Sequence, residues 1–215
     1  MQALTLTQLM AQNRDAPRSI TFHNGENDSR SISFAQLNDR ALGLLHHLRQ
    51  RGAQPGDTVI LLLGSNEQFV DAFWAAVLGG IVPVPVAIGI SDEHRHKLLR
   101  IARKLGNPFL YTDRRTLDRL EAFSAANGTP NDQATFGALA ARCLVADEVP
   151  DVSLKAQPYE ARPEDIAFIQ FSSGSTSEPK GVVLTHANLI ANIDGSTQAA
   201  GFNENDTSLS WMPLT

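Results

Sequence analysis

Residues 171–181 gather side chains that suit a polyphosphate. The segment reads Phe-Ser-Ser-Gly-Ser-Thr-Ser-Glu-Pro-Lys-Gly, with five hydroxyl side chains in six positions, one glycine among them and one lysine after them. Clustered hydroxyl and backbone N–H groups donate hydrogen bonds to phosphate oxygens, glycine allows a sharp turn, and lysine adds a positive charge. The sequence therefore predicts an anion site in this loop.

The order of these residues differs from that of a Walker A loop. A Walker A loop ends in Gly-Lys followed by Ser or Thr and opens a helix, whereas this loop ends in Pro179-Lys180-Gly181 and runs into a pattern typical of a strand. A P-loop phosphotransferase is disfavoured, and it would require a helix that begins at Lys180. Because generic Ser/Thr/Gly clusters are usually solvated turns, the functional argument depends on residue order.

Two predicted strands and a helix position the loop. Residues 166–171 form a short apolar run before the loop, and Val182, Val183 and Leu184 follow it. Thr185 is the predicted N-cap of a helix over residues 186–200. We expect strand, loop, strand and helix in this order.

The preceding sequence alternates helix and strand patterns. Ser33 and Gln36 have capping-box spacing and open a helix that Gly52 ends. Later helices are predicted from Asn66 to Gly79-Gly80, from Ser91, and over about 114–126, and strands over 58–63, 81–87, 109–112 and 143–146. This alternation predicts an α/β fold with a mostly parallel sheet layered with helices.

Strand positions and connections follow from the same patterns. The consecutive apolar residues of 58–63 favour a central strand, while Pro83 and Pro85 favour an edge strand because they lack N–H donors. The polar segment after residue 126 is predicted to be a surface loop, and residues 147–164 a connection between elements.

The phosphate-loop pattern also resembles a known family signature. Ser-Ser-Gly-Ser-Thr-x-x-Pro-Lys-Gly, after an apolar strand and before Val-Val-Leu-Thr-His, is similar to that of the adenylate-forming superfamily: acyl- and aryl-CoA ligases, fatty acyl-AMP ligases, peptide-synthetase adenylation domains and luciferases. Residues 32–37, 56–59 and 73–85 extend the resemblance over nearly the whole chain. The residue order in segments 170–176 and 211–214 is closer to that of fatty acyl-AMP ligases than to that of amino-acid-activating domains. Ser177 departs from the glycine usual there, which bears on the backbone shape of the loop.

The resemblance implies a fold, a reaction and partners. Residues 1–215 would be the first part of the large N-terminal AMP-binding domain, without the rest of that domain or the C-terminal lid domain. The parent enzyme would use ATP and Mg²⁺ to convert a carboxylic acid, of the fatty-acid class, into an acyl-adenylate. It would then pass the acyl group to the thiol of CoA or of the phosphopantetheine of an acyl carrier protein. Amino-acid or aryl-acid adenylation and a non-catalytic module that retains the fold are the alternatives.

The resemblance also assigns roles to the loop residues. The hydroxyls of Ser173, Ser175, Thr176 and Ser177 would hold the β and γ phosphates, and Thr176 would also contact Mg²⁺. The full set of residues expected to bind ATP is Ser172, Ser173, Gly174, Ser175, Thr176, Ser177, Lys180 and Gly181. No complete catalytic set falls within the chain, so we expect these residues alone to be inactive.

Other residues that could do chemistry have simpler interpretations. His186 follows the predicted N-cap and is interpreted as a polar surface residue rather than a base. The two histidine pairs, His46-His47 and His94 with His96, lack the further ligands that a zinc site requires. Trp74 and Trp211 are expected in the core or in a pocket wall.

Composition excludes several classes of protein. The 18 Lys and Arg residues against 23 Asp and Glu give a net charge of −5, which does not suggest a nucleic-acid surface. The single cysteine, Cys143, is expected to be buried and fits a reducing compartment. Residues 1–15 lack a secretory signal pattern, and the apolar run 79–90 is too short to span a bilayer. A cytoplasmic location is expected.

Overall fold

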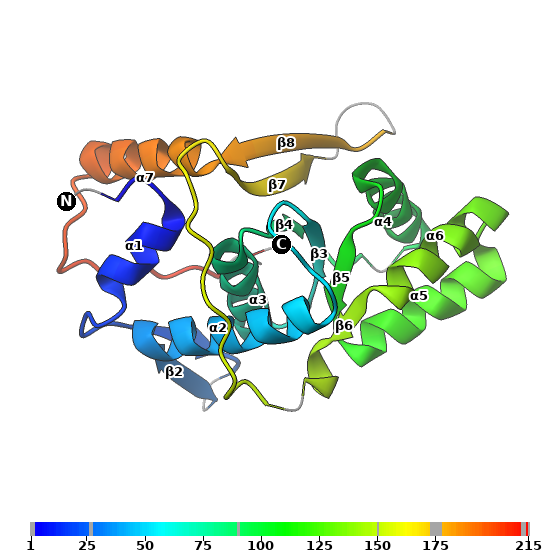
Figure 1. Cartoon of the computed structure of the whole chain (residues 1–215), viewed down its shortest axis with the longest axis horizontal. Helices are drawn as coiled ribbons and strands as arrows, with labels where there is room; N and C mark the ends of the chain where they lie inside the picture. Colours follow the sequence, from blue (N-terminus) through cyan, green and yellow to red (C-terminus); the bar gives the residue numbers. More distant parts are fainter. Residues whose placement is uncertain are drawn as a thin grey trace.

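A four-stranded parallel sheet forms the centre of the computed structural model, which describes residues 3–25, 28–89, 91–149, 151–172, 178–211 and 214 (Figure 1). The sheet has the order β4-β3-β5-β6, and all three strand pairs are parallel. Its strands are β3 (Thr58–Leu62), β4 (Val82–Pro85), β5 (Phe109–Thr112) and β6 (Cys143–Val145). The predicted central strand and the proline-containing edge strand are both confirmed.

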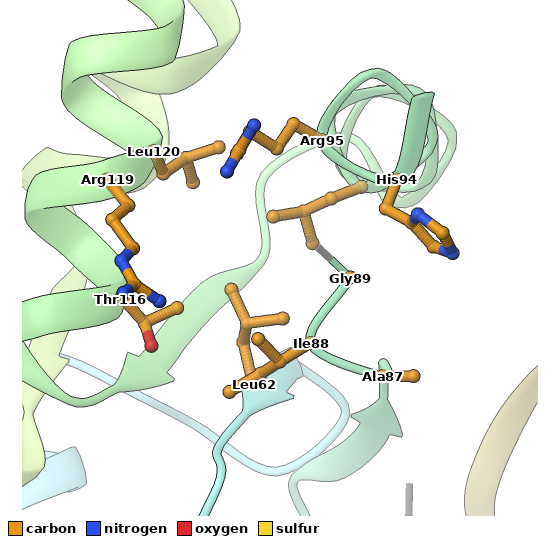
Figure 2. A pocket seen from close by; sticks show the side chains of 10 residues that line it. Leu62, Ala87, Ile88, Gly89, His94, Arg95, Thr116, Arg119 and Leu120 are labelled. Carbon is orange, nitrogen blue, oxygen red and sulfur yellow. The ribbon is translucent and has the colours of Figure 1, made fainter. Parts of the chain in front are cut away.

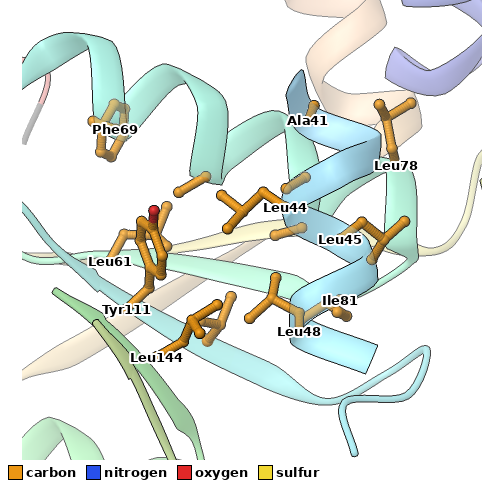
Figure 3. Close-up of a cluster of buried hydrophobic side chains, with 14 of the residues drawn as sticks. Ala41, Leu44, Leu45, Leu48, Leu61, Phe69, Leu78, Ile81, Tyr111 and Leu144 are labelled. Carbon is orange, nitrogen blue, oxygen red and sulfur yellow. The ribbon is translucent and has the colours of Figure 1, made fainter. Parts of the chain in front are cut away.

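Helices cover both faces of this sheet, because side chains alternate between the faces along each strand. Val59 and Leu61 of β3 point into a first core under α2 (Phe34–Gln50) and α3 (Asn66–Gly79). Ile60 and Leu62 point into a second core under α4 (Asp92–Leu105), α5 (Arg114–Asn127) and α6 (Pro130–Ala141). Figure 3 shows how the α2 leucines meet the sheet in the first core. The continuous apolar run of β3 thus serves two cores at once.

Most helix ends follow the predicted signals. Ser33 and Gln36 form the capping box of α2, and Ser91 caps α4. The N-cap of α3 is Ser65, one residue before the predicted Asn66, because the Ser65 hydroxyl accepts from the Gln68 backbone N–H. At the other end Gly80 has a φ of 67°, the left-handed conformation that favours glycine.

The prediction of a surface loop after residue 126 is wrong over most of its length, because α6 begins at Pro130. Thr129 and Asp132 form a capping box, and proline at the first helical position needs no N–H partner. A composition typical of loops was therefore a helix start. Helix α1 (Leu6–Asn13) and the antiparallel hairpin of β1 (Ser19–His23) and β2 (Ser29–Ser33) were not predicted.

The connection after β6 crosses the outside of α2 and α3 after a 3₁₀ turn, η1 (Ala146–Glu148). We call its residues 151–161 the strap. Ala156 N–H donates to Leu42 O at 3.1 Å and Tyr159 N–H to Leu78 O at 2.7 Å. A Cβ at Gly43 would lie 2.2 Å from Val152 O, so the strap crosses α2 where α2 has no side chain.

The C-terminal part is an antiparallel hairpin of β7 (Ile166–Ser172) and β8 (Lys180–Thr185), followed by α7 (His186–Ala200). Strand β7 lies beside β4. Thr185 and Asn188 form the predicted cap of α7. Residues 181–184 are extended, which excludes the helix start that a P-loop phosphotransferase requires. None of the described helices is long and apolar enough to cross a membrane.

Candidate phosphate site

The predicted phosphate loop connects the paired ends of the β7–β8 hairpin. Ser172 pairs with Lys180 and Phe171 with Gly181, so both ends of the loop are fixed by strand pairing. The Lys180 side chain is exposed. Ser173, Gly174, Ser175, Thr176 and Ser177 lie outside the described residues, and so does the predicted magnesium contact of Thr176.

Packing also explains why a glycine stands at position 181, in addition to its predicted role toward phosphate. A Cβ there would lie 3.1 Å from both Ile169 Cγ2 and Phe171 Cζ. Ile169 and Phe171 pack against the second core. The absence of a side chain at Gly181 lets these two residues hold the hairpin on the core.

The second arm of the loop lies near the end of α4. Lys104 Nζ is 3.8 Å from Glu178 Oε2, with about half of each side chain or more exposed to solvent. An exposed ion pair at this distance contributes little to stability. The contact does show where α4 lies, because it places the basic end of this helix beside Glu178 of the predicted phosphate loop.

His186 is buried, which corrects its interpretation as a surface residue. It is 2% exposed, and its Nδ1 accepts a hydrogen bond of 3.1 Å from the Leu6 backbone N–H. Its own backbone N–H donates to Asp165 O at 3.1 Å. Burial lowers the pKa of the imidazole, so the ring is neutral at pH 7. His186 therefore joins α1 to the base of the hairpin, and the long sequence separation gave no signal for this contact.

A cavity of about 340 Å³ lies at the carboxyl ends of β3 and β4, between α4 and α5. Figure 2 shows His94 and Arg95 on α4 across from Thr116 and Arg119 on α5. Arg95 pairs with Asp92 at 2.6 Å, whereas Arg119 has no ion-pair partner among the described residues. Open α/β sheets bind ligands at the carboxyl ends of their strands. Sequence reasoning missed this cavity because α4 and α5 meet only in the folded chain.

The floor of this cavity is apolar and closely packed. Leu62, Leu98 and Leu120 line it together with Ile88. A Cβ at Gly89 would lie 2.0 Å from His94 Cγ, so the imidazole occupies the space above this glycine. The cavity thus combines arginine cations at its sides with hydrocarbon below them.

The remaining candidates have mixed outcomes. Trp74 is half-buried and packs against the first core, whereas Trp211 is 88% exposed and contradicts the expected core or pocket wall. Cys143 is 4% exposed as predicted, and burial raises its pKa to about 11. In the part of the chain that the structure describes, no group of three or more His, Cys, Asp or Glu could hold a metal ion.

Comparison with known proteins assigns the chain to a family and finds the same fold in solved structures. Residues 9–215 match the family model of the AMP-binding enzymes, and the chain belongs to this family. It is 26% identical over 215 residues to the medium-chain-fatty-acid–[acyl-carrier-protein] ligase JamA of Moorena producens, covering 98% of this chain and 35% of that protein. It is 30% identical to the long-chain-fatty-acid–AMP ligase FadD32 of Mycolicibacterium smegmatis, covering 86% of this chain and 28% of that protein. The chain thus spans about a third of the length of these relatives.

Solved structures of adenylation domains share the fold. The adenylation domain of a keto acid-selecting NRPS module, bound to keto acyl adenylate, superposes with a TM-score of 0.86 at 28% identity. That match covers all of this chain and 39% of the other. A fatty acyl-adenylate ligase from L. pneumophila has a TM-score of 0.79 at 24% identity, over 99% of this chain and 36% of that protein, which shows the fold alone. The parallel sheet with its following hairpin therefore has the fold of a part of that adenylation domain.

Proposed function

We propose that this chain supplies the phosphate-binding part of an enzyme that activates a carboxylic acid with ATP. The observation that carries the proposal is the hairpin that closes on Ser172 and Lys180, with a loop rich in hydroxyl groups between them. The rest of the AMP-binding domain and the lid domain would belong to a longer parent protein. Family membership supports this assignment.

The residues at the loop ends fit a nucleotide polyphosphate. Lys180 is exposed and has no acidic partner among the described residues, so its charge is available to an anion. Ser172, Ser173, Ser175, Thr176 and Ser177 would donate hydrogen bonds, while Gly174 and Gly181 would let the backbone approach the phosphates. Thr176 would share Mg²⁺ with the phosphates.

The chain would contribute position and charge to the reaction rather than a proton or a nucleophile. Bound MgATP supplies the α-phosphorus that the carboxylate attacks, with pyrophosphate as the leaving group. The loop would hold the two departing phosphates in line, and Lys180 would offset the negative charge that develops on them. Both effects favour the transition state over the ground state.

Exchange of pyrophosphate into ATP by the longer parent protein tests this function. Lys180→Ala is expected to lower the exchange rate about 100-fold, the scale of one lost electrostatic contact in a transition state. Lys155→Ala is the matched control, because Lys155 is an exposed lysine of the strap that pairs with Asp39 of α2 and lies outside the hairpin. Equal rates for the two variants would reject the proposed role. The 215-residue chain alone is expected to give no exchange above the Lys180→Ala background.

A fatty acid is the proposed substrate, and the thiol of CoA or of a carrier protein is the proposed acceptor. Two relatives are named as fatty-acid ligases, one of them for an acyl carrier protein. Other carboxylic acids are the alternative substrates, because the adenylation domain with the same fold belongs to a keto acid-selecting module. The free, buried thiol of Cys143 supports a cytoplasmic location for the enzyme.

The cavity between α4 and α5 supports the acceptor step, because both proposed acceptors carry phosphate next to a partly apolar chain. Arg119 would pair with a phosphate group while Leu62 and Leu98 contact the hydrocarbon. Arg119→Ala in the parent is expected to raise the KM for the acceptor about tenfold and to leave pyrophosphate exchange unchanged. A loss of exchange with an unchanged acceptor KM would instead assign Arg119 to the first half-reaction.

The alternative is a module that keeps this fold without catalysis. It predicts a parent protein that shows no exchange with any acid, whether or not Lys180 is present. An active parent that depends on Lys180 rejects this alternative.

A further inference from the structure

A second cavity, of about 350 Å³, lies at the opposite end of the hairpin from the phosphate loop. Ile166 begins β7 and His186 follows β8, and both line this cavity. Gly56 and Val82 line it from the amino-terminal ends of β3 and β4. Since β7 has seven residues, the cavity is about 20 Å from the loop. It is therefore separate from the proposed phosphate site.

The cavity has a negative electrostatic character from two independent sources. Glu164 and Asp165 contribute carboxylates, and there is no lysine or arginine among its described lining residues. Val77 and Gly80 bring in the carboxyl end of α3, where the helix dipole is negative. A positively charged group is favoured there.

The Asp165 carboxylate is oriented by two hydrogen bonds to one of its oxygens, and its other oxygen can accept a hydrogen bond from a ligand. Its Oδ2 accepts from the Arg162 backbone N–H at 2.8 Å and from the Tyr159 hydroxyl at 3.3 Å. Its Oδ1 has no hydrogen-bond partner within the described ranges. These contacts orient the carboxylate before a ligand arrives, which reduces the entropic cost of binding.

His186 adds a hydrogen-bond donor beside these acceptors. Because its Nδ1 accepts from Leu6 N–H, the neutral ring must carry its proton on Nε2. The Nδ1 side of the ring faces α1, so the opposite side, with Nε2, is the one available to the cavity that His186 lines. The His186 side chain is 2% exposed, and Nε2 has no hydrogen-bond partner among the residues that the structure places. Within the described residues, fully buried side-chain nitrogen and oxygen atoms without a partner belong to Asp71, Arg100 and Arg142, so Nε2 is not sealed off and can be reached from the cavity that His186 lines. The Nε2–H group can therefore donate to a ligand oxygen at this point.

The rest of the wall is apolar. Val77, Ile81, Val82 and Ile166 line it with the Tyr159 ring. That ring packs closely against Gly80, where a Cβ would lie 2.5 Å from Tyr159 Cδ1. This wall suits a hydrocarbon side chain next to the charged group.

We propose that this cavity binds a positively charged amino group that is adjacent to a carbonyl, as in an amino acid amide or the free amino terminus of a peptide. Glu164, Asp165 and the end of α3 hold the ammonium, and His186 Nε2–H donates to the carbonyl oxygen. An apolar first side chain packs on Ile81 and Val82. A free amino acid binds less well, because its carboxylate is repelled by the two acidic side chains.

Titration of the 215-residue chain with leucinamide, followed by NMR of the His186 ring and of the isoleucine methyl groups, tests the site. We expect saturable shifts of His186 and Ile166 with a Kd on the order of 1 mM, as for one ion pair and one hydrogen bond. N-acetyl-leucinamide, which has no charge, and leucine, which adds a carboxylate, are each expected to bind about tenfold more weakly. Equal binding of the acetylated compound, or no shifts with leucinamide, would overturn the proposal.

Two variants and a matched control connect the shifts to the cavity. Glu164→Gln is expected to weaken leucinamide binding about tenfold, and Asp165→Asn more strongly, although Asn keeps the oxygen that accepts from Arg162 and Tyr159. Glu160→Gln changes a neighbouring exposed carboxylate outside the cavity and should leave the Kd unchanged. If all three variants bind alike, the shifts do not report this site and the proposal fails. A Leu-Gly-Gly peptide amide that binds more tightly than leucinamide would identify a peptide terminus as the ligand, and equal affinity would identify the small amide.

Discussion

The parallel sheet and the β7–β8 hairpin contain similar apolar residues but bury them to different extents. Every residue of β4, β5 and β6 is buried, whereas no residue of β8 is. Val182 and Val183 of β8 are 50% and 51% exposed. The sheet completes its own two cores, while the hairpin is held mainly through β7 and His186. The element that carries the proposed phosphate site is therefore packed on one side only.

The largest expected contrast comes from removing hydrocarbon in each region. Leu45 is fully buried in the first core, so Leu45→Ala should lower the free energy of unfolding by about 3–5 kcal/mol. Val183→Ala removes a half-exposed side chain and should cost below about 0.5 kcal/mol. Urea unfolding measures both values. Similar losses would mean that the hairpin is as closely packed as the sheet.

Two glycines within helices are expected to respond with opposite signs. Gly43 of α2 lies under the strap, and Gly43→Ala should destabilise the protein by about 1–3 kcal/mol because the Cβ meets the Val152 backbone. Gly195 of α7 has open space around it, so Gly195→Ala should stabilise the protein by about 0.5–1 kcal/mol through helix propensity. Thermal unfolding of both variants checks the signs. A stabilising Gly43→Ala would show that the strap moves away at little cost.

The two regions should also differ in their response to pH. Burial raises the pKa of Asp71 to about 6 despite its ion pair with Arg40, from an ordinary value of 3.8. Its folded-state pKa lies above the unfolded one, so the stability that its protonation contributes is present below about pH 4 and lost as pH rises through 6. We expect a loss of about 1–2 kcal/mol from pH 5 to pH 7.5 that Asp71→Asn removes.

His186 should give the opposite trend, because burial lowers its pKa below the ordinary 6.5. Its contribution is present above pH 6.5 and is lost as pH falls from 6.5 toward the lowered folded-state pKa. The Leu6 N–H donates its hydrogen bond to His186, so the protection factor of this amide against hydrogen exchange, taken relative to its intrinsic rate at each pH, should fall in acid more than the protection factors within β3. A uniform change in the protection factors would show that His186 is not a local pH-dependent contact.

Much of the sheet was predictable because its signals are local. The apolar run of β3, the prolines of β4 and the caps at Ser33 and Ser91 act through residues close in sequence. Helix α6 was missed because Thr129-Pro130 was read as loop composition, although its capping box with Asp132 was visible in the sequence. Hairpin β1–β2 was missed because its strands are short and mostly exposed.

The candidate sites divide in the same way. The proposed phosphate loop is contiguous, so residue order alone predicted its chemistry, its family and a strand on either side of it. The antiparallel pairing of these strands, with Ser172 opposite Lys180, came from the structure. Both cavities combine residues from several elements, and no spacing along the chain announces them. The buried position of His186 depends on Leu6, which is 180 residues away.

The sequence by itself thus determined the alternation of elements and supplied the two proposals of a phosphate loop and an acid-activating reaction, because periodicity, capping and a contiguous motif are local properties. Only the tertiary structure decided that Arg119 faces the ends of β3 and β4, that Gly43 lies beneath the strap, and that His186 is buried with one nitrogen engaged. These features depend on the crossing of distant segments, and the packing that brings those segments together leaves no periodic trace in the chain.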